Sequence, residues 1–135
     1  MTFSTYELAL NQDIQDRLRD EIIEVLARHK GEISYDAIME MKYLDMVFNE
    51  TLRRYPVVDI QIRKCVKDFN IPNTNLVIPA GVGIMVPVYA IHNDEQYYEN
   101  PEKFDPERFS DDCHNNVGNW YHPVQVLSLP APAGG

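Results

Sequence analysis

The chain has 135 residues, of which 44% are hydrophobic and 10% aromatic, a composition that indicates a globular domain rather than a disordered segment. Its formal net charge of −9 at pH 7 argues against a nucleic-acid partner, because phosphate binding needs clustered Lys and Arg, and predicts a solvated acidic face. No apolar run is long enough to span a membrane, and Cys65 and Cys113 show neither metal-ligand spacing nor the density of a secreted disulfide scaffold. We therefore expect a reducing compartment, no metal site and no membrane anchor in this chain.

Helical periodicity dominates the first third of the chain. Residues 1–10 have helical character without a capping residue before them, as expected of the end of a longer helix. Apolar residues then recur every three or four positions from Ile14 to Leu26. The predicted caps of this second helix are Asn11 at its start and Gly31 after its end.

Two more helices are predicted before the first strand. Ser34 can cap a short one, and a longer one covers Lys42–Arg54 and ends before Pro56, because proline disfavours helical geometry in the preceding residue. At about 100° per residue, Glu50 falls within the apolar arc of the longer helix, and Arg53 can reach it. The pair is either an exposed contact of little energetic value, which spacing alone favours, or a buried ion pair that needs further donors.

The periodicity shortens after this helix. Residues 57–62 alternate as a half-buried strand does, with Val58, Ile60 and Ile62 on its apolar side. A hairpin is predicted over residues 68–78, around an Asn-rich turn.

A second apolar strand and a long loop follow the hairpin. The strand is predicted over Gly83–Val86 and is ended by Pro87. Residues 92–110 are polar and punctuated by proline, without a sustained period. The large apolar residues Phe104 and Phe109 predict that this stretch is an ordered loop rather than a linker.

Three sequence motifs carry a family resemblance. They are Glu50-Thr51-Leu52-Arg53-Arg54-Tyr55-Pro56, Ala90-Ile91-His92-Asn93-Asp94, and Asn100-Pro101-Glu102-Lys103-Phe104-Asp105-Pro106-Glu107-Arg108-Phe109. Together with Thr5-Tyr6-Glu7-Leu8-Ala9 they resemble microsomal cytochrome P450 enzymes, nearest the branch with insect detoxification and vertebrate drug-metabolising members. The resemblance implies an α+β, mainly α, fragment of that fold over residues 1–110, from the end of the central helix to the loop at Pro106–Phe109.

The resemblance also implies roles for particular residues. Glu50 and Arg53 match a buried pair on the family's K helix, and Arg108 matches its third member, which together hold the haem site in shape. Arg63 matches the strand arginine that contacts a haem propionate, a role suited to a planar guanidinium. The strand implied to line an apolar substrate pocket comprises Val57, Val58, Asp59, Ile60, Gln61 and Ile62.

The intact family member is expected to bind haem, an apolar small molecule and an electron-donating reductase at the cytosolic face of the endoplasmic reticulum membrane, and to metabolise xenobiotics. In this chain the oxygen-activating acid–alcohol pair would precede Met1, and the Phe-x-x-Gly-x-x-x-Cys-x-Gly ligand motif does not follow Phe109. We therefore expect no catalytic residues here, an inactive chain whose location is cytoplasmic or unknown, and a disordered tail at residues 111–135. The alternative is a non-catalytic product with a binding or regulatory role.

Cysteine and histidine residues near the expected haem site are poor candidates for an iron ligand. Cys113 follows Phe109 closely but lacks the glycine frame of the ligand loop, which predicts an ordinary exposed thiol. His92, His114 and His122 are predicted to be surface or packing histidines.

Overall fold

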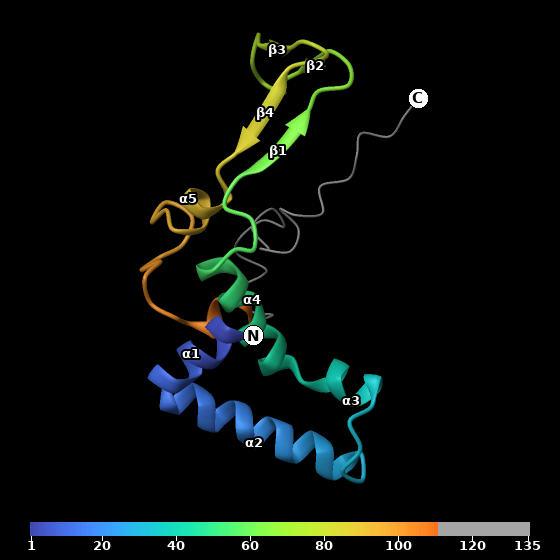
Figure 1. The fold of residues 1–135 in the computed structure, drawn as a ribbon, viewed down its shortest axis with the longest axis vertical. Coiled ribbons are helices and arrows are strands. Elements are labelled where there is room, and N and C mark those ends of the chain that lie inside the picture. The colour runs from blue at the N-terminus through green and yellow to red at the C-terminus, as the bar shows by residue number, and fades with distance from the viewer. Residues whose placement is uncertain (111–135) are drawn as a thin grey trace.

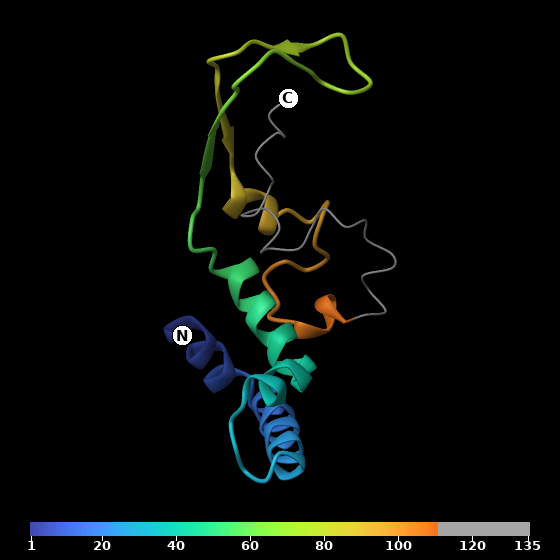
Figure 2. The same cartoon turned by 90° about the vertical axis from the view of Figure 1, so that its right-hand side faces the viewer.

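The computed structural model describes residues 1–110, and the tail predicted over 111–135, with Cys113, His114 and His122, lies outside the described residues. Four α-helices come first: α1 (Thr2–Leu10), α2 (Gln12–Arg28), α3 (Tyr35–Glu40) and α4 (Lys42–Arg54). They gather at one end of the molecule, and the strands extend away from them at the other (Figures 1 and 2). The predicted α+β, mainly α, fold class is confirmed.

Most of the predicted helix ends agree with the structure. Ser34 Oγ accepts from the Ala37 amide at 3.2 Å and caps α3. Gly31 has φ of +81°, and its amide donates to the Leu26 carbonyl at 2.8 Å, as a C-cap glycine does. Asn11 stands at the N-cap position of α2, as predicted, but its side chain donates back to the Glu7 carbonyl at 2.8 Å and so serves the end of α1.

The start of α4 is capped from another helix. Met41, at the N-cap position, contributes no side-chain hydrogen bond. The Glu21 carboxylate of α2 instead accepts from the amides of Tyr43 and Leu44, at 2.8 and 2.9 Å. A negative charge at this position also complements the positive end of the helix dipole. Glu21 therefore fixes α4 against α2.

The apolar core lies between α2, α3 and α4. One buried cluster joins α2 and α4 to the long loop and consists of Leu18, Tyr43, Val47 and Phe104. A second consists of Val25, Ala37 and Met41. Phe104 and Phe109 are buried, which confirms the prediction of an ordered loop.

The strands form two small antiparallel sheets. β1 (Gln61–Lys64) pairs with β4 (Gly83–Val86), with Gln61 opposite Val86, and β2 (Phe69–Asn70) pairs with β3 (Val77–Ile78). The hairpin and the second apolar strand were therefore predicted correctly. The helix α5 (Val88–His92) and the 3-10 helix η1 (Pro106–Phe109) were not predicted.

The first predicted strand was misplaced, and its predicted apolar side is exposed. Residues 57–60 are outside β1, and the Asp59 carbonyl accepts from the Tyr89 amide at 3.1 Å, which ties this stretch to α5. Gln61 is 5% exposed, whereas Ile62 is 67% exposed. The alternation predicted an apolar layer over the strand, and the described residues place none there.

Candidate functional site

Glu50 and Arg53 form a fully buried ion pair on α4. Both side chains have an exposed fraction of 0%. Arg53 Nε lies 2.7 Å from Glu50 Oε2, and Arg53 Nη2 lies 3.0 Å from Glu50 Oε1. These two nearly parallel bonds give the geometry in which guanidinium and carboxylate bind most strongly. The pair is thus the buried alternative rather than the exposed one.

Arg53 also binds the backbone of the long loop. Its Nη1 donates to the His92 carbonyl and its Nη2 to the Pro101 carbonyl, each at 2.7 Å. The guanidinium carbon lies 5.3 Å from the centre of the Tyr98 ring. Because an unpaired buried charge is costly, these acceptors are what allow Arg53 to be buried. The arginine therefore joins α4 to two points of the chain about 40 and 50 residues further on.

Glu50 receives its additional hydrogen bond from the backbone. The Asp105 amide donates to Glu50 Oε1 at 3.0 Å. Arg108 Nε is 3.6 Å from the same oxygen, an ion-pair distance at which no hydrogen bond forms. The Arg108 guanidinium donates instead to loop carbonyls, including that of Asn100 at 2.7 Å. The expectation that Arg108 supplies the extra donor is corrected: the Asp105 amide does so, and Arg108 adds charge and orders the loop.

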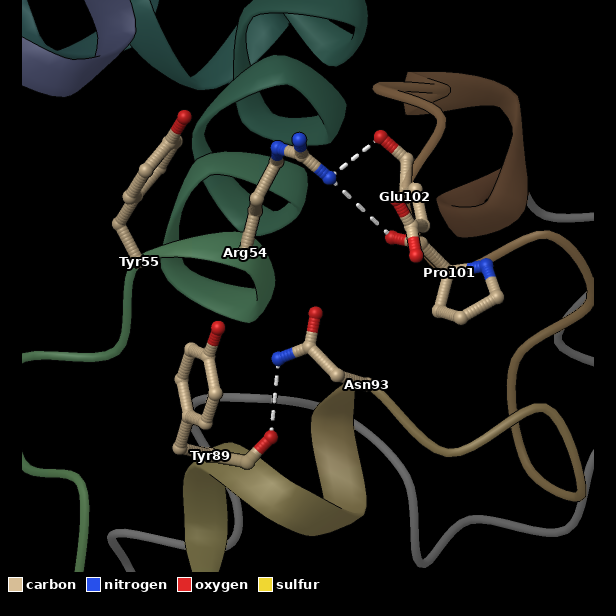
Figure 3. A pocket seen from close by; sticks show the side chains of 6 residues that line it. All are labelled: Arg54, Tyr55, Tyr89, Asn93, Pro101 and Glu102. Atoms are coloured by element: carbon tan, nitrogen blue, oxygen red, sulfur yellow. Dashed lines mark hydrogen bonds between the residues drawn. The ribbon is translucent and has the colours of Figure 1, made fainter.

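A second buried carboxylate contacts the C-terminal end of α4, next to Arg53. Glu7 of α1 is 4% exposed, and its Oε1 accepts from the Tyr55 hydroxyl at 2.5 Å and from Arg54 Nε at 3.1 Å. Arg54 Nη1 donates in turn to the carbonyls of Pro101 and Glu102, as Figure 3 shows. Burial, followed by the bond to Glu7, raises the pKa of Tyr55 above its ordinary 10.0, so the hydroxyl keeps the proton it donates.

The sequence analysis missed this arrangement, which we name the Glu7 cluster: Glu7, Arg54 and Tyr55. By analogy, the Glu50 cluster comprises Glu50, Arg53, Arg108 and the Asp105 amide. A charged residue among the apolar residues of α1 was the available signal for Glu7. Its partners are 47 and 48 positions away, beyond any helical spacing.

Comparison with known proteins identifies the family of this chain. The family model described as Cytochrome P450 matches residues 1–123. The chain belongs to the cytochrome P450 family. The match continues past Phe109, where the sequence analysis had placed the end of the resemblance.

Insect relatives are similar over most of the chain. Cytochrome P450 6B1 of Papilio polyxenes is 53% identical over 107 residues, which are 79% of this chain and 22% of the relative. Cytochrome P450 6j1 of Blattella germanica is 49% identical over 117 residues, 87% of this chain and 23% of the relative. Probable cytochrome P450 6a13 of Drosophila melanogaster is 50% identical over 109 residues, 81% and 22% respectively. This P450 chain thus spans less than a quarter of the length of these relatives.

The other predicted site residues of this P450 segment lie apart from the Glu50 cluster. Arg63 is exposed on β1, and its Nη1 donates to the neighbouring Ile62 carbonyl at 3.1 Å. Of the six residues predicted to line a substrate pocket, Gln61 is buried and the other five are exposed. Within residues 1–110, no helix combines the length and the apolar character needed to cross a bilayer.

His92 packs inside the P450 segment and contacts the Arg53 backbone. Its ring is 1% exposed and lies edge-on to Tyr98, with ring centres 6.1 Å apart. Nδ1 is 3.1 Å from the Arg53 carbonyl, and because a carbonyl only accepts, Nδ1 carries the proton. Burial lowers the pKa of His92 below 6.5; the bond to the Arg53 carbonyl opposes this shift, and the charge of Arg53 adds to it. His92 is therefore a neutral packing residue.

Proposed function

We propose that this segment supports the haem site of a microsomal cytochrome P450 monooxygenase of insect detoxification type. The supporting observation is the buried Glu50–Arg53 pair, whose hydrogen bonds hold the backbone at His92, Pro101 and Asp105. These three points lie on the stretch that leads into the expected ligand loop. A rigid stretch there would keep the ligand loop at a constant distance from the helices.

The reaction of the intact enzyme would insert one atom of O2 into a C–H bond of an apolar substrate. The second oxygen atom would leave as water, with two electrons from a reductase and two protons. When bound, haem supplies the iron at which oxygen is activated and substrate oxidised. The substrate class is proposed to be xenobiotic, and the location the cytosolic face of the endoplasmic reticulum membrane.

Arg63 is the residue of this segment proposed to hold the haem. Within the described part of the chain its exposed guanidinium donates only to a neighbouring backbone carbonyl, so its remaining donors fit a propionate carboxylate. Cys65 is not proposed as the iron ligand, because it is buried and its Sγ lies 2.9 Å from the Lys67 carbonyl. The exposed apolar side chains of Val57, Val58 and Ile60 are proposed to face the substrate.

The 135-residue polypeptide by itself is proposed to be inactive as a monooxygenase. Residues 110–135 contain one cysteine, Cys113, and no glycine stands at the positions that frame the ligand in Phe-x-x-Gly-x-x-x-Cys-x-Gly. Without a thiolate ligand the iron lacks the electron donation that favours cleavage of the O–O bond.

A chimera tests the proposal in a complete cytochrome. Residues 1–110 replace the aligned stretch of P450 6B1 of Papilio polyxenes, which supplies the rest of the protein. We expect the chimera to bind haem, to give the Soret band of a thiolate-ligated ferrous carbon monoxide complex, and to oxidise an apolar substrate with a reductase. Glu50→Gln is expected to abolish the band, whereas Glu95→Gln, at an exposed glutamate of the same loop, is expected to leave it unchanged. A chimera without bound haem, or a Glu50→Gln variant with a full band, would contradict the proposal.

A further inference from the structure

The two buried carboxylates of the segment meet at one backbone carbonyl. Arg53, which pairs with Glu50, donates to Pro101 O at 2.7 Å. Arg54, which pairs with Glu7, donates to the same oxygen at 3.4 Å and also to the Glu102 carbonyl. The Glu7 cluster and the Glu50 cluster are therefore joined through the loop as well as through α4.

Arg54 is hydrogen-bonded to Glu7 at the edge of a cavity. Arg54 lines a cavity of about 300 Å³, together with Tyr55, Tyr89, Asn93, Pro101 and Glu102 (Figure 3). The guanidinium therefore borders open space on one side, and its carbon lies 5.9 Å from the centre of the Tyr55 ring. The hydrogen bond that Arg54 Nε donates to Glu7 holds the guanidinium with Nη1 directed at the loop carbonyls.

Tyr55 holds the Glu7 carboxylate in place. The Phe3 ring of α1 stacks on the Tyr55 ring, with centres 4.4 Å apart and an angle of 5° between the planes. The stacked ring directs its hydroxyl at Glu7 Oε1. A simple surface ion pair would not be buried to this degree or receive a second, neutral donor.

We infer that Glu7 is a positioning residue: through Arg54 it fixes the backbone at Pro101 and Glu102, and thereby the Asp105 amide that binds Glu50. This inference rests on the proposed function, because it assigns to the loop the task of holding the haem ligand segment. It extends the supporting network from α4 to α1. Glu7 is expected to touch neither haem nor substrate.

The chimera provides the test, with Glu7→Gln, Tyr55→Phe and the double variant. Glu7→Gln removes the charge. It is expected to lower, by about tenfold, the ratio of chimera with thiolate-ligated haem to chimera whose haem is bound without the thiolate. Tyr55→Phe keeps the stacking on Phe3 and loses one hydrogen bond, for an expected decrease of about threefold. Tyr55 acts only through the Glu7 carboxylate, so the double variant is expected to match Glu7→Gln alone. Glu7→Asp, which keeps the charge, is expected to recover part of the ratio.

Thermal midpoints of the same variants separate positioning from general stability. A purely structural Glu7 would lower the midpoint while the folded haem protein kept its thiolate-ligated fraction, and this result would overturn the inference. The inference would also be overturned if the double variant lowered the thiolate-ligated ratio by the product of the two single effects. Should Glu7→Gln fail to fold, Tyr55→Phe decides the question by the same ratio. Failure of the proposed function would appear differently, as the absence of the band from the unsubstituted chimera.

Discussion

Glu50 and Asp105 are 55 positions apart in the chain, and the Asp105 amide donates directly to Glu50 Oε1 at 3.0 Å. The Asp105 side chain faces the other way and accepts from the Glu107 amide at 3.3 Å, which caps η1. One residue thus links the carboxylate on α4 to the start of the last described helix. This link depends on a backbone group, so among substitutions of Asp105 only proline removes it directly.

Breaking the buried pair should destabilise the protein strongly. Arg53→Met leaves Glu50 as an uncompensated buried charge and is expected to cost about 3 to 5 kcal/mol. Arg19→Gln is the matched control, since Arg19 and Asp16 pair with side chains 55% and 64% exposed, and such pairs contribute about 0 to 1 kcal/mol. Urea unfolding of the chimera measures both. Equal midpoints for the two variants would contradict the prediction.

The isolated chain should be poorly soluble or molten. Ile62, Val66 and Met85 are 67%, 70% and 64% exposed, and in the described residues β1 and β4 pair only with each other. Unpaired strand edges beside exposed apolar side chains promote aggregation. Amide exchange is expected to be fast in both strands, and Ile62→Thr with Met85→Lys should raise solubility. A monomer with a sharp cooperative melt would count against this.

His92 should make the stability depend on pH. Its pKa in the folded state lies below the ordinary 6.5, so its contribution is complete above that pH and is lost as the pH falls through the folded value. Protonation would place a second positive charge beside Arg53, with the Tyr98 ring packed nearly at right angles to the imidazole. His92→Gln keeps a donor for the Arg53 carbonyl and cannot titrate. Between pH 8 and pH 5 the free energy of unfolding of the chimera should decrease less for the variant than for the unsubstituted protein. An equal decrease in both would refute the attribution of the pH dependence to His92.

The polypeptide alone should not form a thiolate–haem complex. Haemin is added to the 135-residue chain, reduced and exposed to carbon monoxide. We expect no Soret band of the thiolate-ligated type, because Cys113 lacks the glycine frame of the ligand loop. A band that disappears in Cys113→Ser would overturn both the inactivity proposal and the dismissal of that cysteine.

Local signals predicted the helices well and the tertiary contacts poorly. Ser34, Gly31 and Pro56 act on residues within one turn, so their effects could be predicted from the sequence. The buried side of the strand at Gln61 could not be predicted, because it depends on the layer that covers the strand. The short α5 has too few residues for a helical period to appear.

In the candidate site, too, local features could be predicted from the sequence and tertiary contacts could not. Glu50 and Arg53 are three positions apart, and the apolar arc of their helix offered a buried pair as one alternative, although spacing alone favoured an exposed pair. The Asp105 amide is invisible in a sequence, since every residue other than proline carries one. Glu7 needed partners from the far end of α4, which only the packing of α1 against that helix brings close.

Glutamates from two different helices hold the opposite ends of α4: Glu21 of α2 binds the amides of Tyr43 and Leu44, and Glu7 of α1 binds the side chains of Arg54 and Tyr55. A helix advances about 1.5 Å and turns about 100° per residue. A shift of register by one residue therefore combines a translation along the axis with a rotation about it. A slip of one residue would withdraw α4 from both glutamates at once and turn Glu50 away from the Asp105 amide. The axial register of α4 and the direction of the Glu50 carboxylate therefore change together, and the contacts with Glu21 and Glu7 fix both.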